Sequence, residues 1–352
     1  MPKESMTPKE RWLAVLHRQK PDRVPMDYWA TSEATDTLKK HLGCRTRHQL
    51  LKKLHVDYVV KVGPRYSGPR LPRRTDVFGC KFRHLDYGSG VYDECISNPL
   101  AGYRAVEEIA RHYRWPNPDW WDYSDIPSQV RGQEMYPLKG GGSEPFLTYK
   151  NLRGQEQALV DLIENPGIVH YCLDKLFGLA YENSARICEK IPGKVTLFYV
   201  AEDMGGQNDL MFSPGLIREF LLPGMKRIID LAHQAGAFVF HHNDGNCRRI
   251  VPDMIAAGID LLNPIQWRSA GMDRAELKRD FGDKIIFHGA MDNQHTLPFG
   301  SREDVRQEVL DNLRLLGAGG GYILAPCHNI QPITPPENVV AMYETGYECG
   351  WI

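Results

Sequence analysis

The chain of 352 residues is long for one ordinary domain, but it lies within the range in which an α/β barrel forms a single undivided domain. Its 43 Lys and Arg residues nearly balance its 44 Asp and Glu residues, which gives no electrostatic reason to expect a nucleic acid or an anionic membrane as partner. A hydrophobic content of 42% excludes a disordered chain, and no apolar run approaches the roughly 18 residues of a membrane span, so we expect a globular protein with a small-molecule or protein ligand.

The N-terminal region leads directly into a helix. Residues 1–5 contain no apolar signal core, so we expect the protein in the cytoplasm. The motif Thr7-Pro8-Lys9-Glu10 is a capping box with proline at the first helical position, and it predicts a helix through about residue 17. The eight cysteines form no Cys-x-x-Cys pair, which argues against a disulfide framework and against a structural zinc knuckle.

Two apolar runs follow, and an insertion separates them from the rest of the chain. Residues 24–29 and 57–62 predict the first two strands. Between residues 70 and 100, glycines divide the sequence into short runs, a pattern typical of a β-hairpin. We expect this hairpin to decorate the main fold.

From residue 134 onward, strands and helices alternate regularly. The predicted strands are 135–138, 195–201, 237–242, 259–265, 284–289 and 321–325. The predicted helices are 154–164, 166–190, 214–235, 248–257, 273–281 and 301–316, and a last helix runs from Pro335-Pro336-Glu337 to about Cys349. This alternation predicts a parallel sheet that is covered by helices.

With the first two strands included, the count reaches eight. We therefore predict an α/β protein, a (β/α)8 TIM barrel with an inserted β-hairpin near residues 70–100, that forms one domain over residues 1–352. A doubly wound open sheet is the competing fold, but no Gly-x-Gly-x-x-Gly motif follows the first strand.

Polar side chains follow nearly every predicted strand. Active sites of such barrels form where the strands end, so these residues are candidates for the site. The candidates for acid or base catalysis are Glu202, Asp203 and His288. The candidates for substrate binding are Asp27, Tyr28, Trp29, Gln207, Asn208, Asn263, Gln266, Asp292 and Asn293. Lys139, followed by three glycines, is a weaker candidate for holding an anion through backbone amides.

Imidazole, carboxylate and thiolate groups at two strand ends predict a metal site. Catalytic zinc uses three protein ligands and keeps a fourth position open, a number that His242, Asp244 and Cys327 supply. Side chains alternate along a strand, so His241 and His242 cannot both point inward; His242 shares its direction with Asp244, and His241 is the alternative ligand. The competing interpretation is that the polar groups satisfy loop backbone while Cys327 packs as a small hydrophobic residue.

Several of the other candidates also have an ordinary structural explanation. Glu202 or Asp203 is a general base, a further metal ligand or an acceptor for a substrate hydroxyl; alternatively, the pair caps or pairs beneath the helix that begins near Ser213-Pro214. His288 is a site residue or a core histidine with satisfied hydrogen bonds. Asp292 holds substrate or caps the next helix.

The motifs resemble those of the uroporphyrinogen decarboxylase superfamily, which includes zinc-dependent methyltransferases that exchange methyl groups with corrinoid proteins. The resemblance extends over nearly the whole chain and implies a (β/α)8 barrel that is commonly dimeric. It rests on Met6-Thr7-Pro8-Lys9-Glu10-Arg11, Pro21-Asp22-Arg23-Val24-Pro25, Ser213-Pro214, His242 with Gly245, and Thr334-Pro335-Pro336-Glu337-Asn338-Val339.

Two departures decide which branch the chain resembles. True decarboxylases carry an Arg-Gln-Ala-Gly-Arg loop that neutralises substrate carboxylates, whereas this chain has no arginine between Arg23 and Arg45. The methyltransferases carry His-x-Cys-Gly and a later cysteine that together bind zinc; the corresponding residues are His242-Asn243-Asp244-Gly245 and Cys327. Replacing a thiolate by Asp244 makes the ion more Lewis-acidic, which suits the polarisation of a methoxy oxygen.

The resemblance therefore implies a methyltransferase that moves a methyl group from an O-methylated small molecule to a corrinoid protein, assisted by Zn²⁺. No Asp-x-His-x-x-Gly cobalamin motif occurs, so we expect a partner protein to carry the corrinoid. One alternative is a decarboxylase or lyase of a small carboxylated compound, with Glu202 or Asp203 as acid or base. A non-catalytic barrel that binds a small molecule is a second alternative, against which the many ionisable groups at one rim argue.

Overall fold

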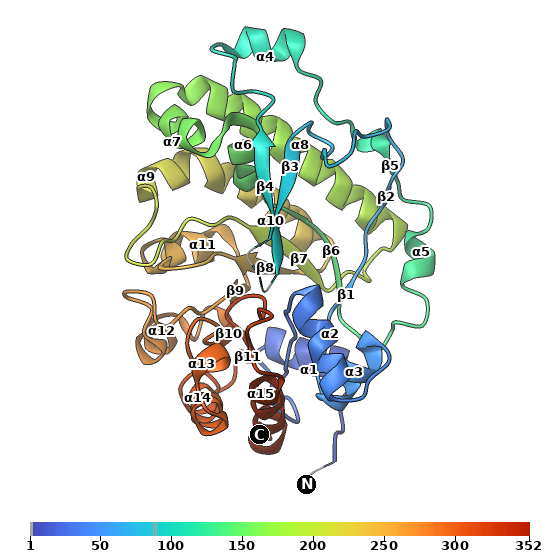
Figure 1. Cartoon of the computed structure of the whole chain (residues 1–352), viewed down its shortest axis with the longest axis vertical. Coiled ribbons are helices and arrows are strands. Elements are labelled where there is room, and N and C mark those ends of the chain that lie inside the picture. Colours follow the sequence, from blue (N-terminus) through green and yellow to red (C-terminus); the bar gives the residue numbers. More distant parts are fainter. Residues whose placement is uncertain (1–2, 87, 89) are drawn as a thin grey trace.

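The centre of the molecule is a parallel sheet of seven strands that curls into an incomplete barrel (Figure 1). The computed structural model describes residues 3–86, 88 and 90–352. In spatial order the strands are β1 (Val60–Lys61), β6 (Leu138–Ser143), β7 (Leu197–Ala201), β8 (Phe238–His242), β9 (Leu261–Asn263), β10 (Ile286–Met291) and β11 (Tyr322–Pro326). Every neighbouring pair in this order is parallel.

The segment 23–30 takes the eighth position, between β11 and β1. Met26 forms a parallel bridge with Leu324, and the Met26 carbonyl accepts a hydrogen bond of 2.8 Å from the Asp57 amide. Pro25 has no amide hydrogen to donate, so this predicted strand forms isolated bridges rather than a continuous ladder. The predicted (β/α)8 class is confirmed, with this irregular segment in the place of a regular first strand.

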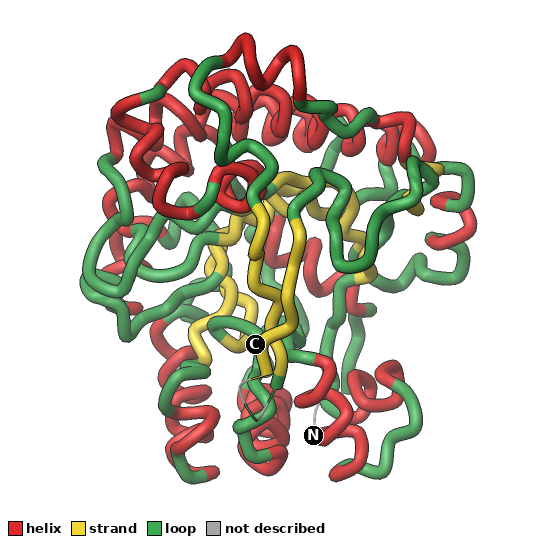
Figure 2. The backbone as a smooth tube through the Cα atoms, turned by 45° about the horizontal axis from the view of Figure 1, so that its top comes forward, coloured by secondary structure: helices red, strands yellow, loops and turns green. Residues whose placement is uncertain are grey.

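Helices surround the sheet (Figure 2). The longer helices are α1 (Pro8–Leu16), α2 (Ser32–His41), α6 (Pro145–Arg153), α7 (Gln155–Glu164), α8 (Pro166–Lys190), α10 (Leu222–Gln234), α12 (Arg274–Phe281), α14 (Arg302–Leu315) and α15 (Pro336–Cys349). The shorter ones are α3 (Arg47–Lys53), α4 (Val106–His112), α5 (Ile126–Gln129), α9 (Pro214–Leu216), α11 (Val251–Ala257) and α13 (Thr296–Phe299), with the turns η1 (Pro118–Trp120), η2 (Ile217–Leu221) and η3 (Arg248–Ile250). Among the described residues, none of the helices has both the length and the apolar character that crossing a membrane requires.

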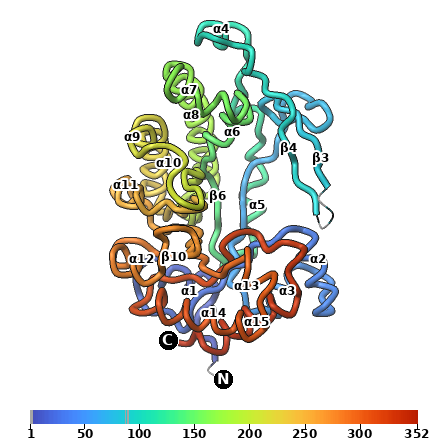
Figure 3. Tube along the Cα trace, turned by 60° about the vertical axis from the view of Figure 1, so that its left-hand side comes forward, coloured from blue at the N-terminus to red at the C-terminus, as the bar shows by residue number. Residues whose placement is uncertain are grey.

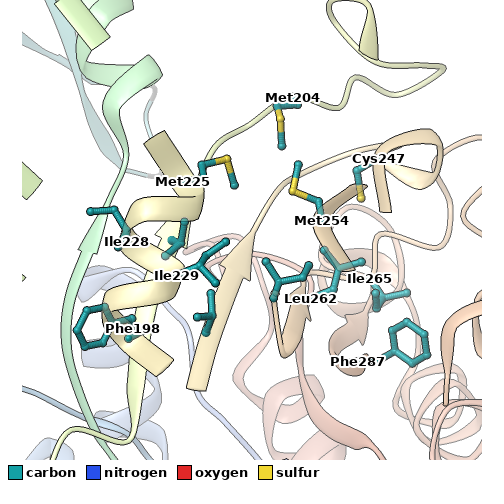
Figure 4. Packing of buried hydrophobic residues seen from close by; sticks show 14 of the residues in the cluster. Phe198, Met204, Met225, Ile228, Ile229, Cys247, Met254, Leu262, Ile265 and Phe287 are labelled. Carbon is teal, nitrogen blue, oxygen red and sulfur yellow. The ribbon is translucent and has the colours of Figure 1, made fainter. Parts of the chain in front are cut away.

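Successive strand residues contribute to two separate cores. Alternation sends Val239 outward into the layer between the sheet and the helices, and Phe240 inward to the barrel axis. Figure 4 shows the outer layer, in which Ile228 and Ile229 of α10 face the strands. Trp12 of α1 packs with Phe240 in the inner core, so α1 closes the N-terminal end of the barrel. The opposite, C-terminal end stays available for a site.

The predicted hairpin is present and projects from the body of the protein (Figure 3). It consists of β3 (Lys81–Asp86) and β4 (Val91–Ser97), which pair antiparallel. A second small antiparallel pair joins β2 (Arg65–Tyr66) to β5 (Trp121–Asp122).

The strand predicted at 135–138 lies later in the chain than expected. β6 runs through the glycines at 140–142, and its register against β7 shifts between Lys139 and Gly142. Lys139 is therefore a strand residue and not the tip of a glycine-rich loop. This correction matters for the site, because it places the lysine on the barrel wall.

Candidate metal centre and adjoining cavity

Three side chains converge at the C-terminal ends of β8 and β11: one is the last residue of β8, and the other two lie in the loops that follow these strands. Donor atoms of His242, Asp244 and His328 all lie within 4.8 Å of one another. The Nε2 atom of His242 is 3.9 Å from one carboxylate oxygen of Asp244, and the Nε2 atom of His328 is 3.8 Å from the other. The inward direction predicted for His242 and Asp244 agrees with this geometry.

Cys327, the third predicted ligand, lies outside this group of donors. Its thiol is buried and donates a hydrogen bond of 3.3 Å to the carbonyl of Ile265. Burial raises the pKa of the Cys327 thiol well above its usual value, so the metal-free protein holds it protonated. The structure thus places His328, the next residue, where Cys327 was expected.

A chain of hydrogen bonds fixes the orientation of His242. Its Nδ1 atom lies 2.6 Å from the side-chain oxygen of Asn263, so Nδ1 carries the proton and the Nε2 lone pair faces the carboxylates. The Asn263 amide then donates to Nδ1 of His288 over 2.7 Å, and Nε2 of His288 donates to Asp27 over 3.1 Å. The indole of Trp29 donates to the same Asp27 oxygen over 2.8 Å.

These hydrogen bonds assign definite positions to five of the predicted candidates. Burial lowers the pKa of His288, against the opposing effect of its bond to Asp27, and so favours the neutral imidazole that the hydrogen bonds require. Asn263 satisfies both histidines at once. An imidazole oriented in this way is the usual arrangement of a histidine that binds a metal.

The donor set fits a metal ion. One carboxylate oxygen of Asp244 is buried and has no hydrogen-bond partner among the described residues. Zinc–ligand bonds of about 2.0–2.1 Å place tetrahedral donors about 3.4 Å apart, close to the observed spacing. Burial raises the pKa of Asp244, while His242 and His328 lower it, so a cation at this point would compensate the buried carboxylate.

Asp203 lies at the same place and has a more exposed side chain. One of its oxygens is 3.8 Å from Nε2 of His242 and accepts a hydrogen bond of 3.2 Å from the Asp244 amide. A Cβ at Gly205 would lie 2.4 Å from the Asp244 carbonyl oxygen, and one at Gly245 would lie 2.5 Å from a backbone oxygen of the facing loop. Only glycines allow the loops after β7 and β8 to approach this closely, and their contact holds the two aspartates together.

Two predicted acids have structural partners instead of facing the donors. Both oxygens of Glu202 accept the Phe146 amide, at 3.0 and 3.1 Å, at the start of α6. Burial raises the pKa of Glu202 well above its usual value. Asp292 accepts the amides of the turn that leads into α13 and pairs with Arg268 at 2.6 Å. Glu202 therefore anchors α6, not the helix after Pro214, and Asp292 anchors α13.

The remaining predicted residues lie at the edge of the site. His241 points into the outer layer, where its Nδ1 atom donates to the Val200 carbonyl, and burial lowers the pKa of His241 to about 4. Gln266 accepts the Gly245 amide over 2.6 Å and so supports the Asp244 loop. Three others complete this set: Gln207, whose side chain contacts Ser269; Asn208, whose carbonyl accepts from Asn246; and Asn293, which lines a small pocket beside Cys327.

A cavity of about 600 Å³ lies beside the metal centre. It is bordered on one side by Trp29, whose ring stacks on His242 with centroids 5.7 Å apart. Tyr28 also lines it, although the Tyr28 hydroxyl is bonded to Thr35. The other lining residues include Asp27, Arg47, Tyr58, Lys61, Lys139 and Phe240.

Sequence reasoning assigned no side-chain role to most of the charged residues around this space. Lys61 of β1 was not among the predicted site residues, and Arg47 lies on α3 and not at a strand end. Glu144 follows β6 and interacts electrostatically with both His242 and Lys139. Only the pairing register of β1 and β6 shows that Lys61 and Lys139 lie next to each other, and the sequence does not give this register.

Comparisons with known proteins identify the family of this chain. A family profile described as uroporphyrinogen decarboxylase (URO-D) matches residues 129–349. The uroporphyrinogen decarboxylase of Serratia proteamaculans is 29% identical over 223 residues, which cover 59% of this chain and 54% of that protein. The decarboxylase of Shewanella pealeana is 25% identical in an alignment 395 positions long that covers 96% of each chain.

A solved structure shares the fold over nearly the full length. It is that of a methyltransferase from Methanosarcina mazei, with a TM-score of 0.66 and 20% identity, covering 98% of this chain and 99% of that one. At this identity the likeness concerns the arrangement of strands and helices.

Proposed function

Because this chain belongs to the uroporphyrinogen decarboxylase family, we propose that it is an enzyme of that family that moves a methyl group from an O-methylated small molecule to a corrinoid on a partner protein. The observation that carries the proposal is the group His242, Asp244 and His328, in which one buried Asp244 oxygen has no hydrogen-bond partner within the described part of the chain. The printed name of the Methanosarcina mazei neighbour, a methyltransferase, is in line with it.

We assign the ligands of a Zn²⁺ ion to His242, Asp244 and His328, with Asp203 next to them. When bound, the ion would supply a Lewis acid that polarises the ether oxygen of the substrate. Asn263 holds the His242 lone pair toward this position, and the paired loops hold Asp244 and Asp203 in place.

The proposed reaction balances as a methyl transfer. The bond between the ether oxygen and the methyl carbon breaks, and the methyl group passes without the bonding electrons to the reduced cobalt(I) of the corrinoid. The oxygen keeps the electron pair and takes up a proton. We assign the delivery of that proton from solvent to Asp203, which is the less buried of the two aspartates near His242.

A second candidate function is decarboxylation of a small carboxylic acid. It is favoured by the cationic residues around the cavity, which suit a carboxylated substrate, and by the names of the Serratia and Shewanella relatives. The lack of arginines between Arg23 and Arg45 does not favour a substrate with as many carboxylates as a porphyrinogen.

One substrate can separate the two reactions. Zinc-loaded protein would be incubated with cob(I)alamin and 4-methoxybenzoate that carries distinct isotope labels in the methyl and carboxyl carbons. Methyl transfer gives methylcobalamin and 4-hydroxybenzoate, whereas decarboxylation gives labelled carbon dioxide and methoxybenzene. We expect the first pair of products, and their loss in His242→Ala. Formation of labelled carbon dioxide without methylcobalamin would contradict methyl transfer and support decarboxylation, the second candidate function.

A further inference from the structure

The cavity beside the metal centre has an excess of positive charge. Arg47, Lys61 and Lys139 line it, and Asp27 is the carboxylate among its lining residues, which leaves a surplus of two positive charges. The side chains of the three cations make no ion pair or hydrogen bond with any residue that the structure describes. Two of them contact aromatic rings instead: Nζ of Lys139 is 4.5 Å from the centroid of Tyr199, and the Arg47 guanidinium is 5.8 Å from that of Tyr28.

Asp27 makes no ion pair with these cations among the described residues, and its oxygens accept hydrogen bonds from other donors. One oxygen accepts the Tyr28 amide over 2.8 Å. The other accepts the indole of Trp29 and the imidazole of His288. The carboxylate thus serves the hydrogen-bond chain that leads to the metal centre.

Two of the cations are direct neighbours across the sheet. Lys61 of β1 and Lys139 of β6 are partners in the parallel ladder, so their side chains leave adjacent strands at the same level. Like charges opposite each other in a sheet cost stability unless an opposite charge lies between them. Partial burial lowers the pKa of Lys139, and the charge of Lys61 lowers it further.

We propose that this cavity binds the carboxylate of a small organic acid, which is held between Lys61 and Lys139 and approached by Arg47 from α3. The inference deepens the proposed function, on which it rests for the reaction: the substrate is an anion, and its charged end lies away from the metal. The cavity volume lies in the usual range for a small-molecule site. Its cations are supplied by β1, β6 and α3, so the site does not depend on an arginine loop after the first strand.

Aromatic rings connect the cations to the metal centre. The ring of Trp29 is 5.7 Å from both His242 and Phe240, and Nζ of Lys139 is 4.5 Å from the centroid of Tyr199 and 5.5 Å from that of Trp29. An acid with a flat ring can pack along this wall, with its carboxylate at Lys139 and its opposite end toward His242. The walls therefore select the orientation as well as the charge.

Calorimetric titration of metal-free full-length protein tests the binding step without any catalysis. The probes are benzoate and 4-methoxybenzoate, each compared with its neutral amide at constant ionic strength. We expect each acid to bind at least about 10-fold more tightly than its amide, as charge-assisted hydrogen bonds predict. In Lys139→Met and in Lys61→Met this preference is lost. Lys284→Met removes an equal charge just before β10, at the closed end of the barrel, and keeps the preference.

The outcomes distinguish a site for organic carboxylates from a site for inorganic anions and from a cavity without a preference for anions. Equal binding of acids and amides, or unchanged binding of the acids in both lysine variants, would overturn the proposal. Tighter binding of inorganic phosphate or sulfate than of either acid would also overturn it, in favour of an inorganic-anion site. If His242→Ala still binds the acids but no methyl transfer is found in the native protein, the anion site stands and the proposed function fails.

Discussion

The two sides of the barrel mouth differ in how their charged and ionisable side chains are held. Around β8, β9 and β10, the acids and imidazoles are oriented by partners, as in the chain from His242 through Asn263 to His288. Around β1 and β6, Lys61 and Lys139 face the cavity and make no ion pair or hydrogen bond with the described residues. The first side presents donor atoms to a cation. The second side carries an excess of positive charge that a bound anion would compensate. A substrate that spans the mouth would meet both.

The sharpest test of the first side compares two adjacent residues. We expect His328→Ala to lose stoichiometric zinc, because the substitution removes a donor atom. The fall in zinc affinity should exceed the roughly 100-fold that is typical when a residue that only supports a ligand is changed. Cys327→Ser should retain the metal, since the Cys327 thiol is bonded to the Ile265 carbonyl. Elemental analysis after dialysis measures both. The reverse result would restore Cys327 as the ligand.

Asn263 tests whether orientation on that side is functional. In Asn263→Leu both imidazoles lose the hydrogen bond to Asn263, so we expect zinc affinity to fall about 10- to 100-fold in competition with a chelator. Asn312→Leu is the matched control, because Asn312 is equally buried but bonds the Ala290 carbonyl. The control should lower the free energy of unfolding and leave zinc affinity unchanged. Equal affinities in the two variants would contradict the assignment.

Charge removal on the second side should have the opposite sign. We expect Lys139→Met to raise the free energy of unfolding of the ligand-free protein by about 0.5–1 kcal/mol, because it relieves the repulsion from Lys61. Urea unfolding without added carboxylic acids gives this value, and Lys284→Met should stay within about 0.5 kcal/mol of the native protein. A clear loss of stability in Lys139→Met would mean that the contact of the lysine with the Tyr199 ring outweighs the repulsion from Lys61.

The last expected effect is a pH dependence of anion binding. Partial burial and Lys61 hold the pKa of Lys139 below the usual 10.5, with Asp27 and Glu144 acting against this shift. An anion favours the protonated amine, so benzoate affinity should fall as pH rises through this lowered pKa, by at most about tenfold per pH unit for one proton. Lys139→Arg should remove the fall below pH 10.5, because arginine stays protonated there. Calorimetry at stepped pH gives the profile, and an identical fall in Lys139→Arg would assign it to another group.

Alternation along the strands explains which site residues the sequence could identify. It predicted the inward direction of His242, and the same reasoning applied to Glu202 would have placed it outward, in line with Val200 of the outer core. The eight-part alternation of the fold was readable because apolar strands and helices repeat over most of the chain. The first strand was also predicted from its apolar residues, and the structure differs only in its hydrogen bonds, because Pro25 interrupts the ladder.

The sequence did not identify site residues that lie beyond the end of a strand, or whose position depends on how two strands pair. β11 stops at Pro326, so the chain turns before Cys327 and the next residue, His328, faces the donors. The glycines after Lys139 look like a loop, yet they continue β6. Lys61 and Lys139 are about eighty residues apart, and only the pairing of their strands reveals that they share one cavity.

The position of Trp29 gives the protein a built-in optical probe. Its indole N–H is held by Asp27, and its ring lies nearly parallel to that of His242, at an angle of 26°. An ion bound at His242 would change the electric field across this indole and thereby its emission. Subtracting the spectrum of a Trp29→Phe variant isolates that emission from the other tryptophans. Loading of the site can then be followed in real time by fluorescence, with no label attached to the protein.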